Sequence, residues 1–383
     1  MATEPACLLI ADISGYTEYL SGVELDHAQD ILADLIGAIV GGLRPAFRLA
    51  KLEGDAAFAF AVGEQIDGSL LLDTIEQCYF RFRRRRRDIH RATSCPCNAC
   101  GHIPDLDLKF VAHHGPILHQ RVSGSDELLG PDVILVHRLL KNHVLASTGI
   151  AAYAVFTQQW VDPMDVDVVA LGLRPADEAY EHLGTVAIWV HDLERRWGEE
   201  EARARVMVSE QDERQHIELT TSVPPQTAWE FFTMPGRRLA WQEGLTSLDV
   251  EAAGNRRGVG TITHCQHGAG TIVEEVLDWR PYDYLTVRST MPSPLGPIRL
   301  VTTTEFEPTP SGGTFVHYRI GSPTSIRERI VMRLLAPRLW ASLRASSARL
   351  AQQLDARPEQ RHDVGDEPEL PRVRPDGPLA GLA

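Results

Sequence analysis

Long apolar segments, an export signal and an excess of positive charge are all missing from this 383-residue sequence. No apolar run approaches the roughly 18 residues of a membrane-spanning helix, so we expect no transmembrane segment. The first residues lack the basic region of a secretory signal peptide, which favours a cytoplasmic protein. A formal net charge of -14 argues against binding to bulk nucleic acid. The chain therefore reads as an ordinary soluble protein.

Cysteine is also scarce, with six residues in the chain, but three of them stand close together at Cys95, Cys97 and Cys100. Without an export signal, such a cluster indicates a metal site or reduced thiols and not a disulfide framework. With His102, the three cysteines would offer zinc a sulfur-rich set of ligands. Their spacing is tighter than that of a usual zinc knuckle, so a distant histidine could be needed. The alternative is a loop of reduced thiols without a metal.

Two aspartates stand beside glycines at the ends of strand-like apolar segments. Asp12 is near the end of the apolar run 8–13, and Asp55 closes the sequence Lys-Leu-Glu-Gly-Asp at 51–55. The residues between them have helical spacing, so two neighbouring strands could present both carboxylates side by side. Paired carboxylates are ligands that Mg²⁺ or Mn²⁺ prefers. The alternative is that both are merely acids at strand ends.

The pattern of apolar residues changes along the chain and predicts two domains of an α+β protein. Residues 5–192 alternate strand-like and helix-like segments, with a cysteine-rich insert at 90–105, and the charged segment 193–213 is interpreted as a linker or connecting helix. Residues 214–355 show short alternating strands and then a long helix. The tail, 356–383, is rich in Pro, Asp and Glu and is expected to be disordered.

Three motifs of the first half belong together: Ala-Asp-Ile-Ser-Gly-Tyr-Thr at 11–17, Lys-Leu-Glu-Gly-Asp at 51–55, and Leu-Lys-Phe-Val-Ala-His-His-Gly-Pro at 108–116. With them, the region from about Cys7 to Leu145 resembles a divergent class III nucleotidyl cyclase catalytic domain. The resemblance implies a ferredoxin-like α/β sandwich and a homodimer with active sites at its interface. It also implies that Asp12 and Asp55 bind the metal ions.

The same resemblance assigns the purine base to Lys51, paired with an acidic residue before Gly130, which is Glu127 or Asp126. It assigns the phosphates to Arg138, in the helix after that glycine. Ile134 stands where the family has an asparagine that orients the ribose.

An isoleucine cannot orient a hydroxyl, and losing one such contact typically costs about 2–4 kcal/mol of transition-state stabilisation. Three possibilities stay open for this domain. It could be an active purine nucleotide cyclase, which is a phosphorus–oxygen lyase. It could bind nucleotide and metal without cyclising, or keep the fold with no nucleotide at all.

The second half carries Val-Pro-Pro-Gln-Thr-Ala-Trp-Glu-Phe-Phe at 223–232, Gly-Val-Gly-Thr at 258–261 and Glu-Glu-Val-Leu-Asp-Trp-Arg-Pro at 274–281. These segments resemble the START-like helix-grip superfamily (SRPBCC), which includes polyketide cyclases and lipid-transfer proteins. The resemblance implies a curved antiparallel sheet around a long C-terminal helix, with an apolar cavity for a hydrophobic small molecule or lipid. We expect Trp241, Ile330 and Leu334 to line this cavity, although plain core packing explains most of the apolar stripe of the helix.

Both halves together predict a signalling-type protein that binds a purine nucleotide with a divalent metal and, separately, a hydrophobic molecule. The alternative is a non-enzymatic ligand- or lipid-binding scaffold, in which the cyclase-like domain only dimerises.

Overall fold

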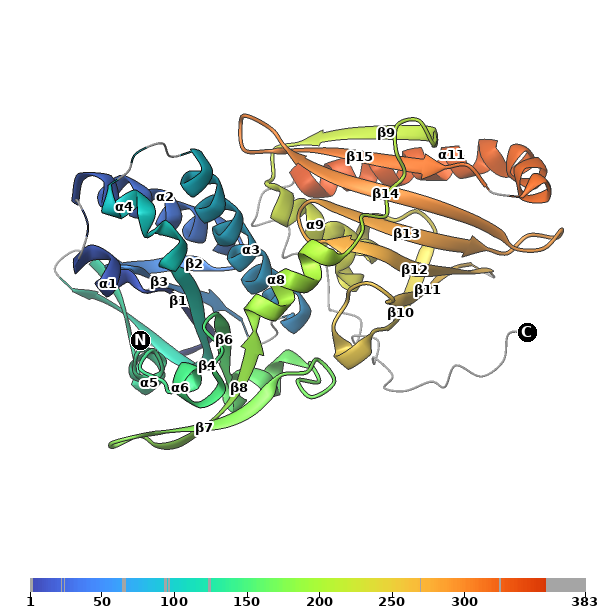
Figure 1. Cartoon of the computed structure of the whole chain (residues 1–383). Helices are drawn as coiled ribbons and strands as arrows, with labels where there is room; N and C mark the ends of the chain where they lie inside the picture. Colours follow the sequence, from blue (N-terminus) through green and yellow to red (C-terminus); the bar gives the residue numbers. More distant parts are fainter. Residues whose placement is uncertain are drawn as a thin grey trace. The chain divides into compact units, whose positions relative to one another are not determined.

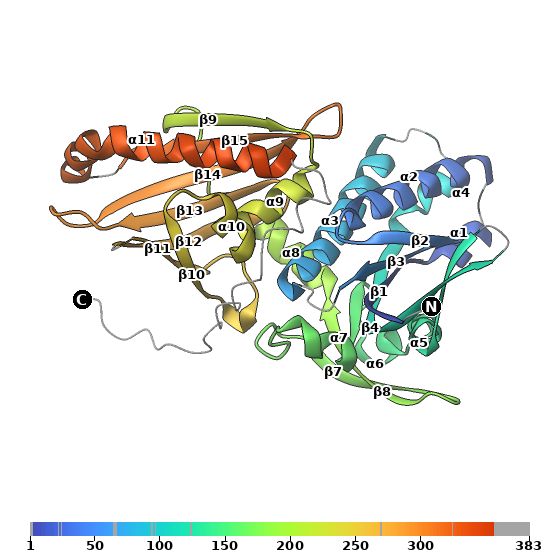
Figure 2. The same cartoon turned by 180° about the vertical axis from the view of Figure 1, so that it is seen from behind.

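The computed structural model of the chain describes residues 3–355 except 22, 24, 64–66, 93–94, 96, 123–124, 269 and 324. The predicted disordered tail, 356–383, lies outside the described residues. The chain divides into two compact units, Met1–Arg203 and Ala204–Ala383 (Figures 1 and 2). Within the described ranges, no helix is both long enough and apolar enough to cross a bilayer.

An eight-stranded sheet forms the centre of the first unit, in the order β2-β3-β1-β4-β6-β8-β7, with β5 paired to β4. The pairs among β2, β3, β1 and β4 are all antiparallel. Together with the helices between them, these strands form the βαββαβ arrangement of a ferredoxin-like sandwich, which confirms the predicted fold class. The strands are β1 (Glu4–Ser14), β2 (Arg48–Glu53), β3 (Ala56–Val62), β4 (Asp107–Val122), β5 (Ser125–Leu129), β6 (Tyr153–Thr157), β7 (Arg174–Tyr180) and β8 (Gly184–Asp192). The helices are α1 (Tyr16–Ser21), α2 (Leu25–Leu43), α3 (Gly68–Ala92), α4 (Asn98–Gly101), η1 (Ile103–Asp105), α5 (Pro131–Leu139), α6 (Val144–Thr148), α7 (Gln158–Val161), η2 (Asp162–Met164) and α8 (Leu193–Ala202).

Strand β1 shows how this sheet separates two cores. Because successive side chains of a strand point to opposite faces, Leu9 and Ala11 join the core that contains residues of α2 and α3. Leu8 and Ile10 join the other core, to which α5 contributes Val136. Asp12 continues the second series, so its side chain lies on the α5 face of the sheet. Figure 1 shows α2 and α3 on the opposite face.

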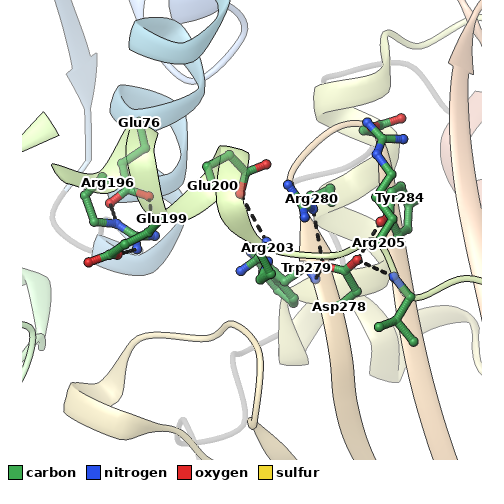
Figure 3. Close-up of polar contacts among 12 residues, drawn as sticks. Glu76, Arg196, Glu199, Glu200, Arg203, Arg205, Asp278, Trp279, Arg280 and Tyr284 are labelled. Carbon is green, nitrogen blue, oxygen red and sulfur yellow. Dashed lines mark hydrogen bonds and ion pairs between the residues drawn. The ribbon is translucent and has the colours of Figure 1, made fainter. Parts of the chain in front are cut away.

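The first part of the predicted linker is a helix of the first unit. Trp197 of α8 is buried in the same core as α2 and α3. In Figure 3, Arg196 of α8 reaches Glu76 of α3, with Nε 3.0 Å from Oε1. His191, at the end of β8, places Nε2 2.7 Å from the same buried oxygen. The charged composition of this segment therefore reflects one solvated face of a packed helix.

An antiparallel sheet in the order β10-β11-β12-β13-β14-β15-β9 forms the second unit, together with α11. Figure 2 shows α11 lying across one face of this sheet. This is the predicted helix-grip arrangement, and β10 is a strand that the sequence did not indicate. The strands are β9 (Glu213–Thr221), β10 (Leu245–Glu251), β11 (Ile262–His267), β12 (Gly270–Arg280), β13 (Tyr284–Met291), β14 (Ile298–Pro308) and β15 (Thr314–Gly321). The helices are α9 (Pro225–Thr233), α10 (Pro235–Trp241), η3 (Ala253–Asn255) and α11 (Ile326–Asp355).

Candidate functional site

Asp12 and Asp55 are brought together where β1 ends beside the β2–β3 turn. The backbone N–H of Ile13 donates to the carbonyl of Asp55 at 3.3 Å. Gly54 forms the turn with φ +69°, a conformation that favours glycine. Burial raises the pKa of Asp55, and the charge of Asp12 raises it further. Two half-buried carboxylates that repel each other would be stabilised by a divalent cation, which prefers such oxygen ligands.

A lysine that the sequence did not point to completes this cluster of charges. Lys109 of β4 is the register partner of Asp12. Its Nζ lies 3.0 Å from Asp12 Oδ2, and the two side chains are 20% and 16% exposed. Lys109 also lowers the pKa of Asp55, against the larger effect of burial. A metal ion at the two carboxylates must therefore compete with an ammonium that already neutralises part of their charge.

Lys51 and Glu127, the pair assigned to the purine base, form an ion pair with Nζ 3.5 Å from Oε1. Their side chains are 52% and 38% exposed, so the pair is open to an incoming molecule. The side chain of Asp126, the alternative partner, lies outside the described residues. Since an exposed ion pair contributes little to stability, its two side chains are available for recognition.

The helix assigned to ribose and phosphate presents an apolar and a basic residue on one face. Ile134 of α5 is 57% exposed. Arg138 follows four residues later and is also exposed, so the two side chains lie one above the other on the helix. The arginine can reach an anion from outside the sheet, whereas Ile134 offers no hydrogen bond beside it.

Two polar neighbours of Ile134 are already engaged within the unit. Asp132 accepts from the buried His113, with Oδ1 2.8 Å from Nε2. His137 places Nε2 3.0 Å from Glu53 Oε2. Neither side chain is therefore positioned to replace the asparagine of the family.

Gly115 makes the contact between His113 and Asp132 possible. A Cβ at position 115 would lie 2.4 Å from Cγ of Asp132, which is closer than real Cβ atoms come to a neighbour. The absent side chain leaves the space that the carboxylate occupies. Burial lowers the pKa of His113, although Asp132 opposes this effect.

The cysteine cluster is assembled, but without the histidine predicted for it. The Sγ atoms of Cys95, Cys97 and Cys100 lie within 4.8 Å of one another. His102 is instead exposed, with Nδ1 2.7 Å from Asp105 Oδ2. The structure therefore does not bring His102 together with the three sulfurs, because η1 follows directly and places the Asp105 carboxylate beside its ring.

A cavity of about 290 Å³ lies in the second unit, between the sheet and α11. Alternate residues of the strands point into it, as the period of a strand requires. On β15 these are Val316, Tyr318 and Ile320, and Trp241 of α10 also lines the cavity. Most of the lining is apolar, as expected for a hydrophobic ligand.

The helix side of the cavity differs from the prediction. Ile330 and Leu334 are 58% and 71% exposed and face solvent. The cavity is lined instead by Leu339 and Leu343 on the next turns of α11. Apolar residues occur on more than one side of this helix, so the sequence pattern did not single out the inward face.

A largely buried ion pair, with side chains 15% and 16% exposed, gives the cavity one polar wall. Arg238 of α10 places Nη1 2.9 Å from Oε2 of Glu274 on β12. Burial disfavours the charge of Arg238, but Glu274 outweighs it, and the pKa of the guanidinium is raised. Cys265 lies beside them, and burial raises the pKa of its thiol to about 12. The sequence did not indicate this pair, because α10 and β12 are separated along the chain and come together only in the folded unit.

Comparisons with known proteins cover both units. The family model "Protein of unknown function (DUF2652)" matches residues 32–148, and "Polyketide cyclase / dehydrase and lipid transport" matches residues 214–355. The second match confirms the helix-grip resemblance over nearly all described residues of the second unit. A curated relative, "Uncharacterized protein Rv2561/Rv2562" of Mycobacterium tuberculosis, is 36% identical over 162 residues, which are 42% of this chain and 73% of that protein.

Solved structures that are similar to parts of this chain include a structural-genomics protein and two nucleotide cyclases. Protein MLL2253 from Mesorhizobium loti is 23% identical, with 37% of this chain and 98% of that one covered and a TM-score of 0.30. The guanylyl cyclase Cya2 is 12% identical, with 49% and 92% covered and a TM-score of 0.39. The adenylyl cyclase CyaB from P. aeruginosa is 14% identical, with 50% and 95% covered and a TM-score of 0.37.

Proposed function

We propose, for a chain that belongs to the family of the uncharacterized Mycobacterium tuberculosis protein Rv2561/Rv2562, that its second unit binds a hydrophobic molecule with one polar end. The observation that carries this proposal is the cavity of about 290 Å³ between the sheet and α11. Binding would be favourable, because the apolar walls would remove the ligand's apolar surface from water. The lipid-transport description of the matching family model supports the same class of ligand.

The polar end of the ligand is inferred from the largely buried Arg238–Glu274 pair. Both charges already satisfy each other, so the wall would favour a dipolar group, such as a hydroxyl or carbonyl, over a full charge. Tyr318, whose pKa is raised by burial, adds a neutral hydroxyl to the same cavity. A long-chain alcohol or a ketone should therefore bind better than the matching alkane.

Two substitutions at neighbouring positions of β13 test this proposal. Val287 lines the cavity, whereas the side chain of Arg288 lies on the other face and is 43% exposed. In Val287→Trp the new side chain fills the cavity, and binding of a C12 alcohol, measured by calorimetry, should fall at least tenfold. Arg288→Trp should bind as the wild type does. Equal affinity in both variants, each folded by circular dichroism, would place the ligand elsewhere.

A second candidate function belongs to the first unit, which we propose binds a purine nucleotide together with Mg²⁺ or Mn²⁺. It is favoured by the adjacent carboxylates of Asp12 and Asp55 and by the exposed Lys51–Glu127 pair. The carboxylates would hold the metal, and the ion pair would offer a donor and an acceptor to the edge of a purine. Metal at Asp12 would release the Lys109 ammonium, which could then pair with a phosphate oxygen.

We propose binding without efficient cyclisation. Ile134 cannot hold a ribose hydroxyl, and Asp132 and His137 are engaged elsewhere. Arg138 remains available for phosphate on an open helix face. In this proposal the nucleotide site is completed by a second copy of the chain, which would supply its own Lys51, Glu127 and Arg138.

Nucleotide binding is tested with fluorescent ATP and GTP analogues in Mn²⁺, comparing Asp12→Asn with Asp34→Asn. Asp34 is an exposed acid of α2 that pairs with Arg85. Only the first substitution should abolish binding. Cyclic product that is lost in Asp12→Asn would show an active cyclase. No binding by the wild type would leave the first unit with the alternative role of a dimerising scaffold.

For the cysteine cluster we propose a zinc ion held by Cys95, Cys97 and Cys100. Three sulfur ligands within 4.8 Å of one another are supplied by a short segment, and a tetrahedral site would need one further ligand. Such an ion would hold the segment that carries α4 together, which is a structural role.

A further inference from the structure

The outer face of the second sheet carries two histidines beside each other, away from the cavity. His216 lies on the edge strand β9 and His317 on its neighbour β15. Ile217 and Val316 line the cavity, so the histidines next to them point to the opposite face. The two rings approach closely, with His216 Nε2 3.2 Å from His317 Nδ1.

We propose that His216, His317 and Glu218 bind a transition-metal ion, with Zn²⁺, Ni²⁺ or Cu²⁺ as candidates. One ligand atom of each residue lies within 4.8 Å of the others. Glu218 Oε1 is 3.7 Å from His317 Nδ1, which is itself 3.2 Å from His216 Nε2. Metal–ligand bonds of about 2.0–2.2 Å in a tetrahedron separate the ligands by about 3.3–3.6 Å. The three residues are therefore near the required spacing before any metal arrives.

Further carboxylates stand near the far nitrogens of the imidazole rings, within ion-pair range but beyond hydrogen-bond distance. Glu307 Oε2 lies 3.7 Å from His317 Nε2, the ring nitrogen opposite the proposed ligand atom. Glu213 Oε1 lies 4.0 Å from His216 Nδ1. A carboxylate that accepts the far N–H of a histidine leaves the near nitrogen free to bind metal and makes it more basic. The ring that donates to the other would shift its hydrogen to its own far nitrogen, so two neutral histidines can both bind metal without net proton release.

The charge around the histidines also favours a cation. Arg319, the register partner of His216, is a basic residue on this face, but Glu305 and Glu213 each accept from it at 2.6 Å. Glu218 and Glu307 are left to the histidines among the described contacts. A metal here would link the edge strand β9 to β15, at the start of the second unit. The site is separate from the ligand cavity, because it lies on the other side of the sheet.

Zinc titration of the full chain against a chromophoric chelator tests this site, with His317→Gln and the control His264→Gln. His264 is a partly exposed histidine of β11 that pairs with Glu251. His317→Gln should lose one equivalent of bound zinc, while any zinc held by the cysteines stays. His264→Gln should match the wild type. Equal stoichiometry in the wild type and His317→Gln, or wild-type binding only at millimolar zinc, would overturn the proposal.

Two further variants keep the test decisive if His317→Gln does not fold. Glu218→Gln changes an exposed ligand and should lose the same equivalent. Glu307→Gln should keep the stoichiometry but weaken the affinity about tenfold, as expected for a group that orients a ligand. An unchanged affinity in Glu218→Gln would also contradict the proposed ligand set.

Discussion

Lys109 and Asp12 face each other across β4 and β1, with the ammonium 3.0 Å from the carboxylate. The candidate metal site thus contains its own positive charge. This arrangement keeps the carboxylate pair compatible with a folded chain before any cation binds. It also sets an electrostatic competition that can be measured.

Removing the ammonium should strengthen the binding of metal in the absence of nucleotide. In Lys109→Met, Mn²⁺ no longer competes with the ammonium for the carboxylates. We therefore expect the Kd of Mn²⁺ to fall about tenfold, which corresponds to about 1.4 kcal/mol. Lys109→Arg keeps the charge and should stay near the wild type. Electron paramagnetic resonance of free Mn²⁺ measures both. An unchanged or weaker affinity in Lys109→Met would show that the metal does not use Asp12.

The Lys51–Glu127 pair should matter for the purine base and little for folding. An exposed ion pair contributes about 0.2–1 kcal/mol to stability, so Lys51→Ala should shift the melting temperature only slightly. Binding of ATP or GTP should weaken about tenfold, whereas CTP binding should not change relative to the wild type. Glu127→Gln should alter the preference between ATP and GTP. An equal loss for purine and pyrimidine nucleotides would argue against a contact with the base.

Asp55 should make stability depend on pH. Its pKa is raised in the folded state by burial and by Asp12, so its ionised form destabilises the fold. This cost is absent below the unfolded pKa of about 3.9 and complete above the raised folded pKa. Asp55→Asn should therefore melt at a higher temperature than the wild type at pH 7, and the difference should shrink as the pH falls towards 4. Thermal melts across this range measure it, and a constant difference would contradict the assignment.

Removing one member of the Arg238–Glu274 pair should lower the stability of the fold, whereas replacing both members by apolar residues should change it little. Breaking a fully buried pair typically costs about 3–5 kcal/mol, and Arg238→Met, which leaves the 16%-exposed Glu274 without its partner, should lose somewhat less. The double variant Arg238→Met/Glu274→Leu removes both charges and should recover most of that loss. It should also bind an alkane better than the matching alcohol, reversing the expected preference. Urea unfolding and calorimetry measure the two effects, and a double variant as unstable as the single one would contradict them.

The features of this molecule that the sequence predicted are those that depend on local patterns of residues. The apolar run of β1 and the glycines after Asp12 and before Asp55 predicted the strand and the turn that bring the two carboxylates together. Lys51 and Glu127 were found through a resemblance, and the structure places them 3.5 Å apart.

The unpredicted parts depend on register and on helix rotation. Lys109 meets Asp12 only because β4 pairs with β1 in one particular register, and a one-residue slip would turn it to the other face. Ile330 and Leu334 are spaced as a helical stripe, yet they face solvent. Arg238 meets Glu274 across elements that are distant in sequence. Such contacts are not visible in any short window of residues.

Gly115 has a consequence for how this family can change over time. Because a side chain there would overlap the carboxylate of Asp132, positions 115 and 132 cannot vary independently. A relative with alanine at 115 should carry a smaller residue at 132, and its counterpart of His113 would then lose a hydrogen-bond partner. These three positions should be inherited together, so a correlated change among them in distant sequences would mark the branch in which this corner of the sandwich was rebuilt.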